Sequence, residues 1–598
     1  MRRRRFLKLL AGSAAVGALG PVLGGAHAAS PVRRVGPGEP GWPDDAAWKT
    51  LGEQVRGNLR RVESPFAGSA VPPELLKQLE NPYFVGDQAW ATQSTGWAGA
   101  WTSSPSAWVV TARTAEDVAA AVNFARERRL RLVVKGGGHS YQGTSNAPGS
   151  LLVWTRPMDR IVLHDAFVPE GCAAKAQPVP AVSVGAGQMW FHTYDAVTTH
   201  GGRYVQGGGC ATVGVAGLIQ SGGFGSFSKR YGMAAASLLE ADVVTADGKI
   251  RTVNACRDPD LFWALKGGGG GTFGVVTRLT LRTHPLPETF GAMFLTIEAD
   301  SDATYRRLIE RFVAFYRSAL FNPTWGEQAR FGPRNKLAVT MLFQGIDGKQ
   351  AEEVWRPFLA EVDRPGSGLK YDGNHGAMSV RARDFWNAEL LRSKLPPYVR
   401  ADPRPGAPAS NLWWASNNEE LGIYWYGYES TWMPQSLLRE DRQKDLAAAV
   451  FAASRHWTVG FHFNKGLAGS PPEAIAAARG TATNPAVLDA FALVIIAGGG
   501  DPVYPGVPGH APNETEAKDQ ARRIHLAMAE IRKLVPDPGS YVSESNYFEP
   551  GFQRAFWGPN YKRLLSIKRK YDPTGLFFVH HGVGSEDWSP DGMSRAAT

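Results

Sequence analysis

The sequence predicts an α+β protein in which a region of mixed strands and helices precedes an antiparallel sheet. Residues 240–245 alternate apolar and polar side chains as a strand does, whereas residues 115–128 carry the longer apolar period of a helix. From about residue 290 the predicted strands become rich in aromatic residues, as in 423–428. The chain has 598 residues, 43% of them hydrophobic and 20% charged, which is typical of a globular protein with two large domains.

The first region reads as strands joined by short loops and helices. Residues 130–134, 181–184 and 275–281 are apolar or alternating runs that favour strands. Asp247-Gly248 favours a hairpin turn after the strand at 240–245. Prolines at 285 and 287 indicate the end of this region.

Helices and aromatic strands alternate in the second region. Residues 303–318 and 514–534 have helical periodicity and lie on either side of the aromatic strands. This order predicts an antiparallel sheet with helices on one face.

Three glycine-rich runs interrupt the first region. Residues 135–143 read Lys-Gly-Gly-Gly-His-Ser-Tyr-Gln-Gly, and similar runs occupy 207–214 and 267–271. Glycines let the backbone approach a bulky ligand and direct its N–H groups at phosphates. Residues 269–274 also fit the pattern Gly-x-Gly-x-x-Gly, but a predicted helix precedes them and a strand follows. That order is the reverse of a Rossmann site, so we exclude one here.

Further motifs occur before, between and after these runs in a fixed order along the chain. They are Ala107-Trp108-Val109-Val110, Ser221-Gly222-Gly223-Phe224-Gly225, residues 260–268, Phe273-Gly274-Val275-Val276-Thr277, Trp557-Gly558-Pro559-Asn560-Tyr561 and Lys570-Tyr571-Asp572-Pro573. The ordered set resembles the vanillyl-alcohol-oxidase superfamily with its PCMH-type FAD-binding domain, and within it the berberine-bridge-enzyme-like branch. Residues 149–155 and 582–588 are most similar to isoamyl-alcohol-oxidase-like and oligosaccharide-oxidase-like members.

We expect four segments. The residues of 1–28 themselves indicate a twin-arginine signal peptide, and the resemblance implies a PCMH-type FAD-binding domain at 45–287. A substrate domain, an antiparallel sheet with helices on one face, follows at 288–539. A berberine-bridge-like segment at 540–590 returns to the FAD-binding domain.

The resemblance also implies a covalently bound FAD. His139 matches the histidine that bonds to the 8α-methyl of the flavin, and Cys210 matches the cysteine that bonds to its C6. Two bonds of this kind hold the ring rigidly and raise its reduction potential. The predicted cofactor-binding residues are Lys135, Gly136, Gly137, Gly138, His139, Ser140, Tyr141, Gly143, Gly209, Cys210, Val213, Gly214, Gly217, Gly274, Val276 and Asn560.

The predicted reaction removes hydride from a carbon and a proton from its hydroxyl group. Val213 stands where members that use O2 carry valine, which favours an oxidase. A tyrosine near the start of a Tyr-x-Asn-x element is the base in related oxidases. Tyr541 takes that position but Ser543 replaces the asparagine, so we rank Tyr541 first, then Glu544, then Tyr547.

These expectations describe an exported oxidase that acts on a small alcohol or sugar hydroxyl with O2 and yields a carbonyl or lactone and hydrogen peroxide. One alternative is a tailoring enzyme of secondary metabolism that closes a ring oxidatively. The other is a flavin electron-transfer protein without oxidase activity. Peroxide production separates the first from the last.

The amino terminus predicts export in the folded state. Four arginines and a lysine within the first eight residues precede an apolar run at 9–23 and Ala26-His27-Ala28. We interpret this as a twin-arginine signal, which requires the export machinery of that name and predicts a periplasmic or secreted protein. The apolar run is too short to span a membrane well, so no stable membrane association is expected.

Other partners and cofactors are not indicated. No basic stripe interleaved with aromatic residues suggests nucleic acid, and the Cys and His spacings of zinc sites are absent. Besides Cys210 the chain has Cys172 and Cys256, which either pair or stay free.

Overall fold

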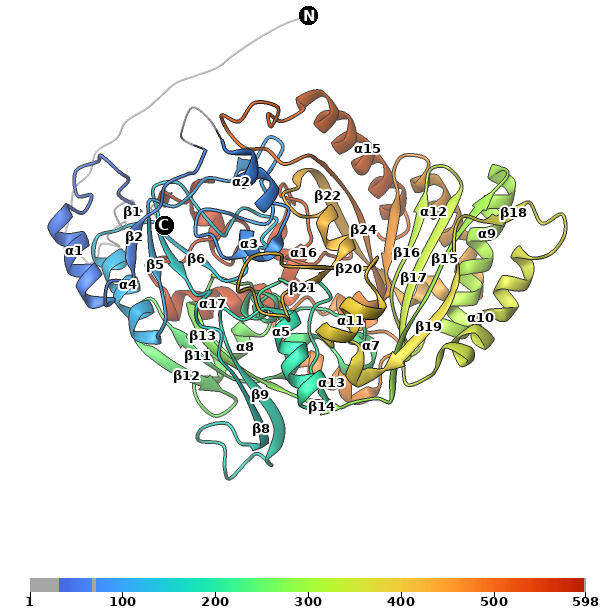
Figure 1. The fold of residues 1–598 in the computed structure, drawn as a ribbon, viewed down its shortest axis with the longest axis horizontal. Coiled ribbons are helices and arrows are strands. Elements are labelled where there is room, and N and C mark those ends of the chain that lie inside the picture. The colour runs from blue at the N-terminus through green and yellow to red at the C-terminus, as the bar shows by residue number, and fades with distance from the viewer. Residues whose placement is uncertain (1–31, 67–70, 596–598) are drawn as a thin grey trace, which may run out of the picture.

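The structure is a computed structural model that describes residues 32–66 and 71–595. The signal peptide predicted for 1–28 lies outside the described residues. The molecule is elongated: the amino-terminal third, in blue and green, forms one end, and a large sheet, in yellow and orange, forms the other (Figure 1).

A small, mainly parallel sheet begins the amino-terminal end, with β7 parallel to β5 and β6 on its two sides. The order β2-β5-β7-β6 comprises Leu59–Arg61, Trp108–Thr111, Leu151–Trp154 and Leu132–Lys135. Helix α4 (Ala115–Glu127) covers it together with α1 (Asp45–Gln54). Thr114 and Asp117 form a capping box, which explains why α4 begins there.

A five-stranded antiparallel sheet lies beside the first. Its order β12-β11-β13-β9-β8 comprises Ile250–Asn254, Leu238–Val244, Val275–Arg282, Val179–Gly185 and Ile161–Phe167. The predicted Asp247-Gly248 turn joins β11 to β12, with Gly248 at φ 75°. Helix α8 (Pro259–Leu265) precedes the third glycine run and β13 follows it, which confirms the exclusion of a Rossmann site.

A ten-stranded sheet dominates the opposite end. Its strands are β18 (Leu369–Tyr371), β15 (Thr289–Ala299), β17 (Lys336–Gln344), β16 (Trp325–Gly332), β23 (Val459–His462), β24 (Ala490–Gly500), β22 (Tyr424–Pro434), β3 (Gly96–Trp97) and β4 (Trp101–Thr102), with β19 (Gly376–Arg381) also paired to β15. Its last two strands come from residues 96–102, within the predicted FAD-binding domain. All its pairs are antiparallel except that of β22 with β3.

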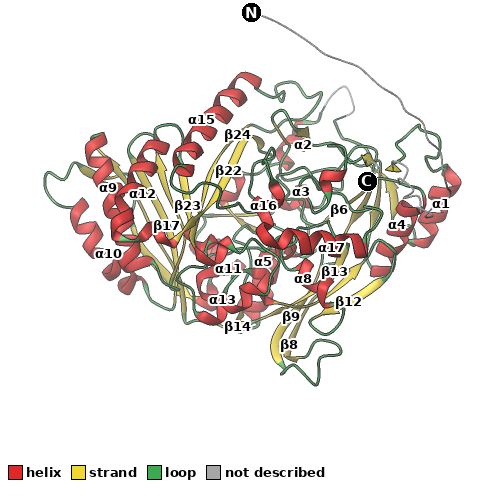
Figure 2. Cartoon of the chain, turned by 180° about the vertical axis from the view of Figure 1, so that it is seen from behind, coloured by secondary structure: helices red, strands yellow, loops and turns green. Residues whose placement is uncertain are grey.

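Four helices pack on one face of this sheet, as Figure 2 shows from behind. They are α9 (Asp302–Phe315), α10 (Gly348–Val362), α12 (Glu440–Ser454) and α15 (Glu514–Arg532). The apolar core between them and the strands includes Phe312, Trp355 and Val450. On the opposite face, Trp425, Tyr428 and Trp432 pack toward the amino-terminal end. The α+β fold class with helices on one face of the large sheet is confirmed.

The carboxyl-terminal helices α16 (Phe552–Trp557) and α17 (Tyr561–Tyr571) pack against the amino-terminal end. Lys568 Nζ donates to Thr272 O at 2.6 Å and to Asp572 Oδ2 at 2.6 Å. Phe577 forms an isolated parallel bridge with Leu132 of β6. The last part of the chain therefore helps to support the strand that leads into the first glycine run.

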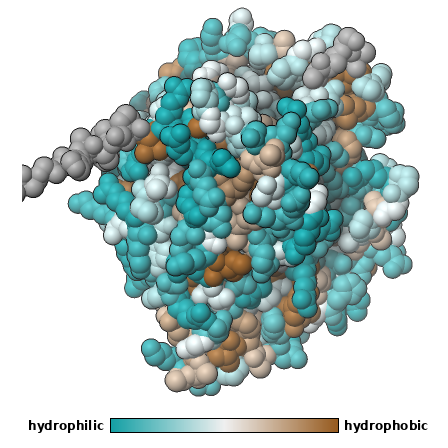
Figure 3. Space-filling model, turned by 90° about the vertical axis from the view of Figure 1, so that its left-hand side faces the viewer, coloured by the Kyte–Doolittle hydropathy of each residue, from teal (hydrophilic) through white to brown (hydrophobic). Residues whose placement is uncertain are grey.

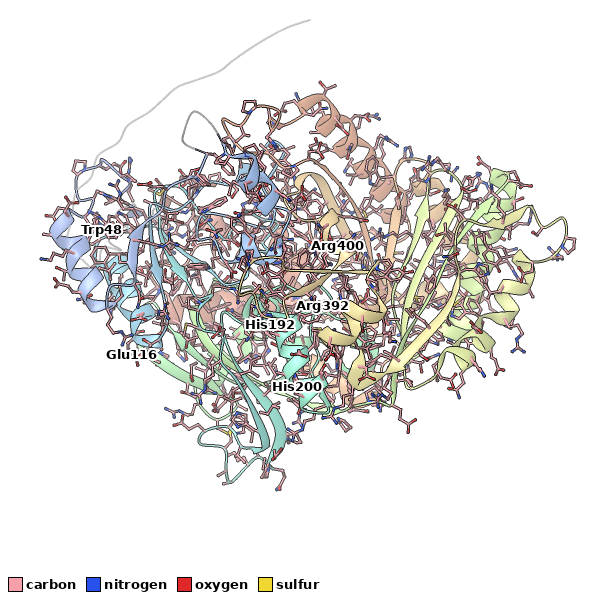
Figure 4. All side chains as sticks on the ribbon, viewed as in Figure 1. Trp48, Glu116, His192, His200, Arg392 and Arg400 are labelled. Atoms are coloured by element: carbon pink, nitrogen blue, oxygen red, sulfur yellow. A yellow bond between two sulfur atoms is a disulfide. The ribbon has the colours of Figure 1, made fainter. Side chains whose placement is uncertain are left out.

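The space-filling view of the amino-terminal end is mainly hydrophilic, with hydrophobic residues scattered over it (Figure 3). Within 32–66 and 71–595, no helix combines the length and the apolar character needed to cross a membrane. Trp48 on α1 marks this end of the molecule, whereas His192 on α5 (Trp190–Tyr194) lies near its middle (Figure 4).

Cys172 and Cys256 form a disulfide. The bond ties the loop between β8 and β9 to the end of β12. It resolves the choice that the sequence left open and leaves Cys210 as a free, half-buried thiol.

Candidate functional site

The first glycine run forms the loop that follows β6. Gly138 and Gly143 take φ values of 76° and 67°, which glycine tolerates best. A Cβ on Gly143 would lie 2.6 Å from the Trp101 ring, so this loop packs closely on β4. Ser140 Oγ accepts from the hydroxyl of Thr144 at 2.7 Å, which closes the loop on itself.

The second glycine run touches the first. A Cβ on Gly137 would lie 2.7 Å from Gly214 N and 3.0 Å from Thr212 O. Gly207 packs equally tightly on the Trp190 ring, where an added Cβ would lie 2.1 Å away. The two loops approach to backbone contact because their facing residues lack side chains.

His139 lies where these loops meet. Its Nε2 is 3.0 Å from the Thr212 hydroxyl, which orients the ring. Burial lowers the pKa of His139 to about 4, although part of the ring stays accessible. The imidazole is therefore neutral near pH 7.

Cys210 lies in the second loop, near Tyr141 of the first. Asn417 Nδ2 is 3.5 Å from Cys210 Sγ, and Asn417 Oδ1 accepts from Ala211 N at 3.4 Å. Burial raises the pKa of the thiol, and the charge of Glu420 raises it further. The thiol is accordingly protonated at neutral pH.

The second loop also presents open backbone suited to a long polar ligand. Gly209 and Gly217 are exposed, and no atom lies within 4 Å of a Cβ placed on either. Nearby, the buried atoms Gln220 Oε1 and Thr272 Oγ1 lack hydrogen-bond partners in the described structure. Exposed backbone and unpaired polar atoms beside glycine-rich loops fit the phosphates and polar chain of FAD.

Two other predicted cofactor-binding residues use their side chains for hydrogen bonds within the protein. Lys135 Nζ donates to the carbonyls of Gln88, Ala89 and Ala91 at 2.9, 2.6 and 2.9 Å. Asn560 Nδ2 donates to Thr483 O at 2.9 Å. The side chains of Lys135 and Asn560 therefore hold neighbouring backbone in place instead of remaining free for a ligand.

Backbone packing accounts for the other predicted positions. A Cβ on Gly274 would lie 2.7 Å from the Val244 carbonyl, and one on Gly136 would lie 3.2 Å from Ala186 O. Val276 is buried in the core, and Val213 is partly buried against the same cluster. No contact here tests whether these residues bind a cofactor, so their assignment stays a prediction.

The three candidate bases have different surroundings. Tyr541 is buried against Phe224, and its hydroxyl accepts from Gly223 N at 3.3 Å. Burial raises its pKa well above the usual value of a tyrosine. Glu544 forms an ion pair with Lys465. Tyr547 stacks on His580 with ring centroids 3.8 Å apart.

The structure brings further carboxylates to the same place. Glu420 accepts from Tyr141 Oη at 2.7 Å, and Glu327 accepts from Ser226 Oγ at 2.5 Å. Burial raises the pKa of both carboxyl groups, and each of them is affected by the charges of Lys465 and Glu544. The charges of three carboxylates and one lysine act on the Cys210 thiol, and we call this group the acidic wall: Glu327, Glu420, Lys465 and Glu544.

Glu327 adopts an unusual backbone conformation within β16, with φ at 69°. For a residue with a side chain this conformation costs on the order of 1 kcal/mol. Its carboxylate also accepts from Asn464 Nδ2 at 3.3 Å. The hydrogen bonds from Ser226 and Asn464 compensate for part of this cost.

The sequence did not reveal Glu327, Glu420, Lys465 or Asn417. They come from separate segments, and no local motif marks them. A weak signal exists for Glu420, an acidic residue directly before the aromatic run at 423–428. The pair His580-His581, which resembles a metal pair, has another role: His580 Nε2 donates to Tyr547 O at 2.8 Å. Within the described residues, no group of three or more His, Cys, Asp or Glu has the geometry to hold a metal ion.

Two family models match the chain. The FAD binding domain matches residues 106–254, and "Berberine and berberine like" matches residues 540–584. The first match contains both glycine loops, His139 and Cys210.

Curated relatives match over most of their length. The FAD-linked oxidoreductase easE of Arthroderma benhamiae is 31% identical over 80% of this chain and 88% of its own. The FAD-linked oxidoreductase malF of Malbranchea aurantiaca is 30% identical over 93% and 92%.

Solved structures share the fold. A VAO-type flavoprotein of Myceliophthora thermophila C1 aligns with a TM-score of 0.77 and 25% identity, over 94% of this chain and all of its own. The glucooligosaccharide oxidase of Acremonium strictum aligns with a TM-score of 0.61 and 20% identity, over 80% and 92%. The fold, the paired glycine loops and these matches lead to one conclusion: the chain belongs to the FAD-linked oxidoreductases with a VAO-type fold and a berberine-bridge-like carboxyl-terminal segment, and it is an FAD-dependent oxidoreductase.

Proposed function

We propose that this protein is an exported oxidase with FAD bonded to His139 and Cys210, which oxidises an alcohol or sugar hydroxyl to a carbonyl or lactone and releases hydrogen peroxide. One observation carries the proposal: the two glycine loops meet at a neutral histidine, and the second loop holds a free thiol on which the charges of the acidic wall act. FAD, when bound, supplies the acceptor for the carbon-bound hydrogen and its electron pair, which O2 then takes up.

The state of the two side chains supports covalent attachment. A neutral imidazole keeps a lone pair for a new bond, and the hydrogen bond to Thr212 holds the ring in one orientation. Cys210 is a free thiol that retains accessible surface. The similar glucooligosaccharide oxidase is described as carrying 6-S-cysteinyl, 8α-N1-histidyl FAD, the same pair of linkages that we propose here.

The acidic wall supports oxidation of a hydroxyl group. Carboxylates accept a proton from a hydroxyl and hydrogen-bond to its neighbours. A carbohydrate oxidase of Microdochium nivale shares the fold, with a TM-score of 0.63 and 19% identity over 90% of this chain and 99% of its own. We take from it only a class of compounds to screen, which agrees with placing the chain near the oligosaccharide-oxidase-like or isoamyl-alcohol-oxidase-like members.

Export rests on the sequence of residues 1–28 alone. A variant with Arg2, Arg3, Arg4 and Arg5 all replaced by lysine keeps the charge but should be recognised less well as a twin-arginine signal. We expect the replaced protein to stay in the cytoplasm with its flavin attached. Equal export of both proteins would argue against the twin-arginine route.

The decisive experiment is mass spectrometry of the acid-denatured protein, followed by peptide mapping and a peroxide screen over alcohols and oligosaccharides. We expect the mass of one FAD added to the chain, linkages at His139 and Cys210, and peroxide with at least one hydroxyl compound. Protein without FAD after cofactor loading would refute the proposal. A product with a new carbon–carbon bond would instead indicate oxidative ring closure, and flavin reduction without peroxide would indicate electron transfer.

A further inference from the structure

One short turn reaches over both flavin-binding loops. The 3₁₀ turn η5 (Ala415–Glu419) and the residue after it precede β22. Asn417 of this turn contacts Cys210 in the second loop, with Nδ2 3.5 Å from Sγ. Glu420 accepts a 2.7 Å hydrogen bond from Tyr141 in the first loop. The turn therefore places a carboxylate beside the two segments that carry His139 and Cys210.

The Glu420 carboxylate has spare capacity to accept a proton. The bond from Tyr141 to Oε2 is the one hydrogen bond to this carboxylate found among residues 32–66 and 71–595. The side chain is only partly covered, and Oε1 is not among the fully buried polar atoms that lack a partner. A carboxylate accepts through both oxygens, and one of the two is uncommitted here.

Several charged and titratable groups act on the Glu420 carboxylate. Tyr141 donates to it, and the charges of Glu544, Lys465 and Arg330 act on it. Glu420 acts in turn on Cys210 and Tyr428. Burial raises the pKa of Glu420 more than Tyr141, Lys465 and Arg330 lower it, so that it titrates above the usual range of a glutamate.

The three candidate bases from the sequence, and Glu327 of the acidic wall, already have partners within the protein. Tyr541 is buried in an apolar cluster, and its hydroxyl accepts a hydrogen bond from Gly223 N. Glu544 is paired with Lys465. Tyr547 stacks on His580, and its ring lies near Trp97, with centroids 6.0 Å apart. Glu327 already accepts from Ser226 and Asn464.

We propose that Glu420 is the base that takes the hydroxyl proton of the substrate and that Tyr141 is the residue that positions it. The assignment rests on the proposed function. The O–H bond breaks with its proton going to Glu420, the carbon-bound hydrogen leaves as hydride to the flavin, and the C–O bond becomes C=O. O2 would then take the electron pair and the hydrogen of that hydride, as a proton, together with the proton that Glu420 releases, and so form hydrogen peroxide.

The test compares holoenzymes that carry Glu420→Gln, Tyr141→Phe and Glu419→Gln. Glu419 is exposed on the same turn, so its variant is the matched control. The measurement is the anaerobic rate of flavin bleaching by benzyl alcohol, by cellobiose and by the best compound of the peroxide screen, over a range of pH. Flavin content and thermal midpoint of each variant report whether it folds and loads.

We expect Glu420→Gln to bleach at least about 100-fold more slowly than the wild type, the usual contribution of a general base. Glu419→Gln stays within about twofold of the wild type, as expected for a surface change. In Tyr141→Phe the rise of the rate with pH moves to higher pH, because the hydrogen bond that lowers the pKa of Glu420 is gone. A purely structural Tyr141 would lower the rate without moving this profile.

A second readout does not depend on turnover. Infrared difference spectra of the holoenzyme between acidic and alkaline pH should contain a carboxylic-acid band from Glu420. This band should be missing in Glu420→Gln, and in Tyr141→Phe it should titrate at higher pH. Absence of that band in the wild type overturns the proposal.

The outcomes separate the two levels of inference. If the flavin of the wild type bleaches and that of folded, flavin-loaded Glu420→Gln bleaches equally fast, the proposed role of Glu420 is overturned. The proposed oxidase activity is then unaffected. Loss of bleaching in Tyr541→Phe alone would transfer the role to Tyr541. A wild type that no hydroxyl compound bleaches overturns the proposed function, and the base assignment with it.

Discussion

The glycine loops and the acidic wall are joined by the hydrogen bond from Tyr141 to Glu420 but are built in different ways. The loops at 135–143 and 207–214 are continuous segments whose glycines allow backbone to touch backbone. The acidic wall gathers side chains from β16, the end of η5, the turn η7 (Phe463–Lys465) and the carboxyl-terminal segment. A contiguous motif can encode the first kind of surface, whereas only long-range packing creates the second.

Removing the proposed linkages should give the largest effect on the loop side. We expect His139→Ala with Cys210→Ala to release all FAD on acid denaturation, because no bond to the chain remains. Each single variant should keep one linkage, which peptide mapping would locate. The mass of the denatured protein is the measurement, and covalent FAD that persists in the double variant would show that neither residue is the attachment point.

Separating the two loops should cost stability. Gly137→Ala places a Cβ 2.7 Å from Gly214 N, so the backbones must move apart at a cost of about 2–3 kcal/mol in the free energy of unfolding. Gly270→Ala is the matched control, because an added Cβ there would meet its nearest atom at 3.8 Å. Urea denaturation of both variants measures the difference. Equal stability would mean that the loops are not in backbone contact.

On the side of the acidic wall, Lys465→Met leaves Glu544 unpaired beside Glu327 and Glu420. We expect a loss of about 2 kcal/mol at pH 8 and less at pH 5, where the neighbouring carboxyls are closer to neutral. Adding Glu544→Gln should recover most of the loss, and a double-mutant cycle at both pH values measures it. Additive effects would indicate that the pair is not coupled.

The smallest expected effect is on the pH dependence of the free energy of unfolding, which has opposite signs for the acidic wall and for the glycine loops. Burial raises the pKa of Glu327, so from about pH 4.5 upward the folded state binds more protons than the unfolded state. The free energy of unfolding therefore falls as pH rises through this window, and Glu327→Gln should give a flatter profile. His139 before flavin attachment, with its pKa lowered from 6.5 to about 4, has the opposite sign: its contribution to stability is lost as pH falls from 6.5 to about 4. Unfolding curves at several pH values for the wild type and Glu327→Gln provide the check, and parallel profiles would contradict it.

The sequence by itself determined the α+β class, the hairpin at Asp247-Gly248, the helix at 115–127 and the loops that contain His139 and Cys210. Each of these depends on local rules: periodicity, turn chemistry, capping, or the need for glycine where backbones touch.

Only the tertiary structure decided the pairing of Cys172 with Cys256 and the makeup of the acidic wall. Tyr141 and Glu420 are 279 positions apart, and Lys465 and Glu544 are 79 apart, so no sequence window contains either pair. Their chemistry depends on burial, which raises the pKa of Glu327 and Glu420, and burial is a property of the packed molecule rather than of its segments.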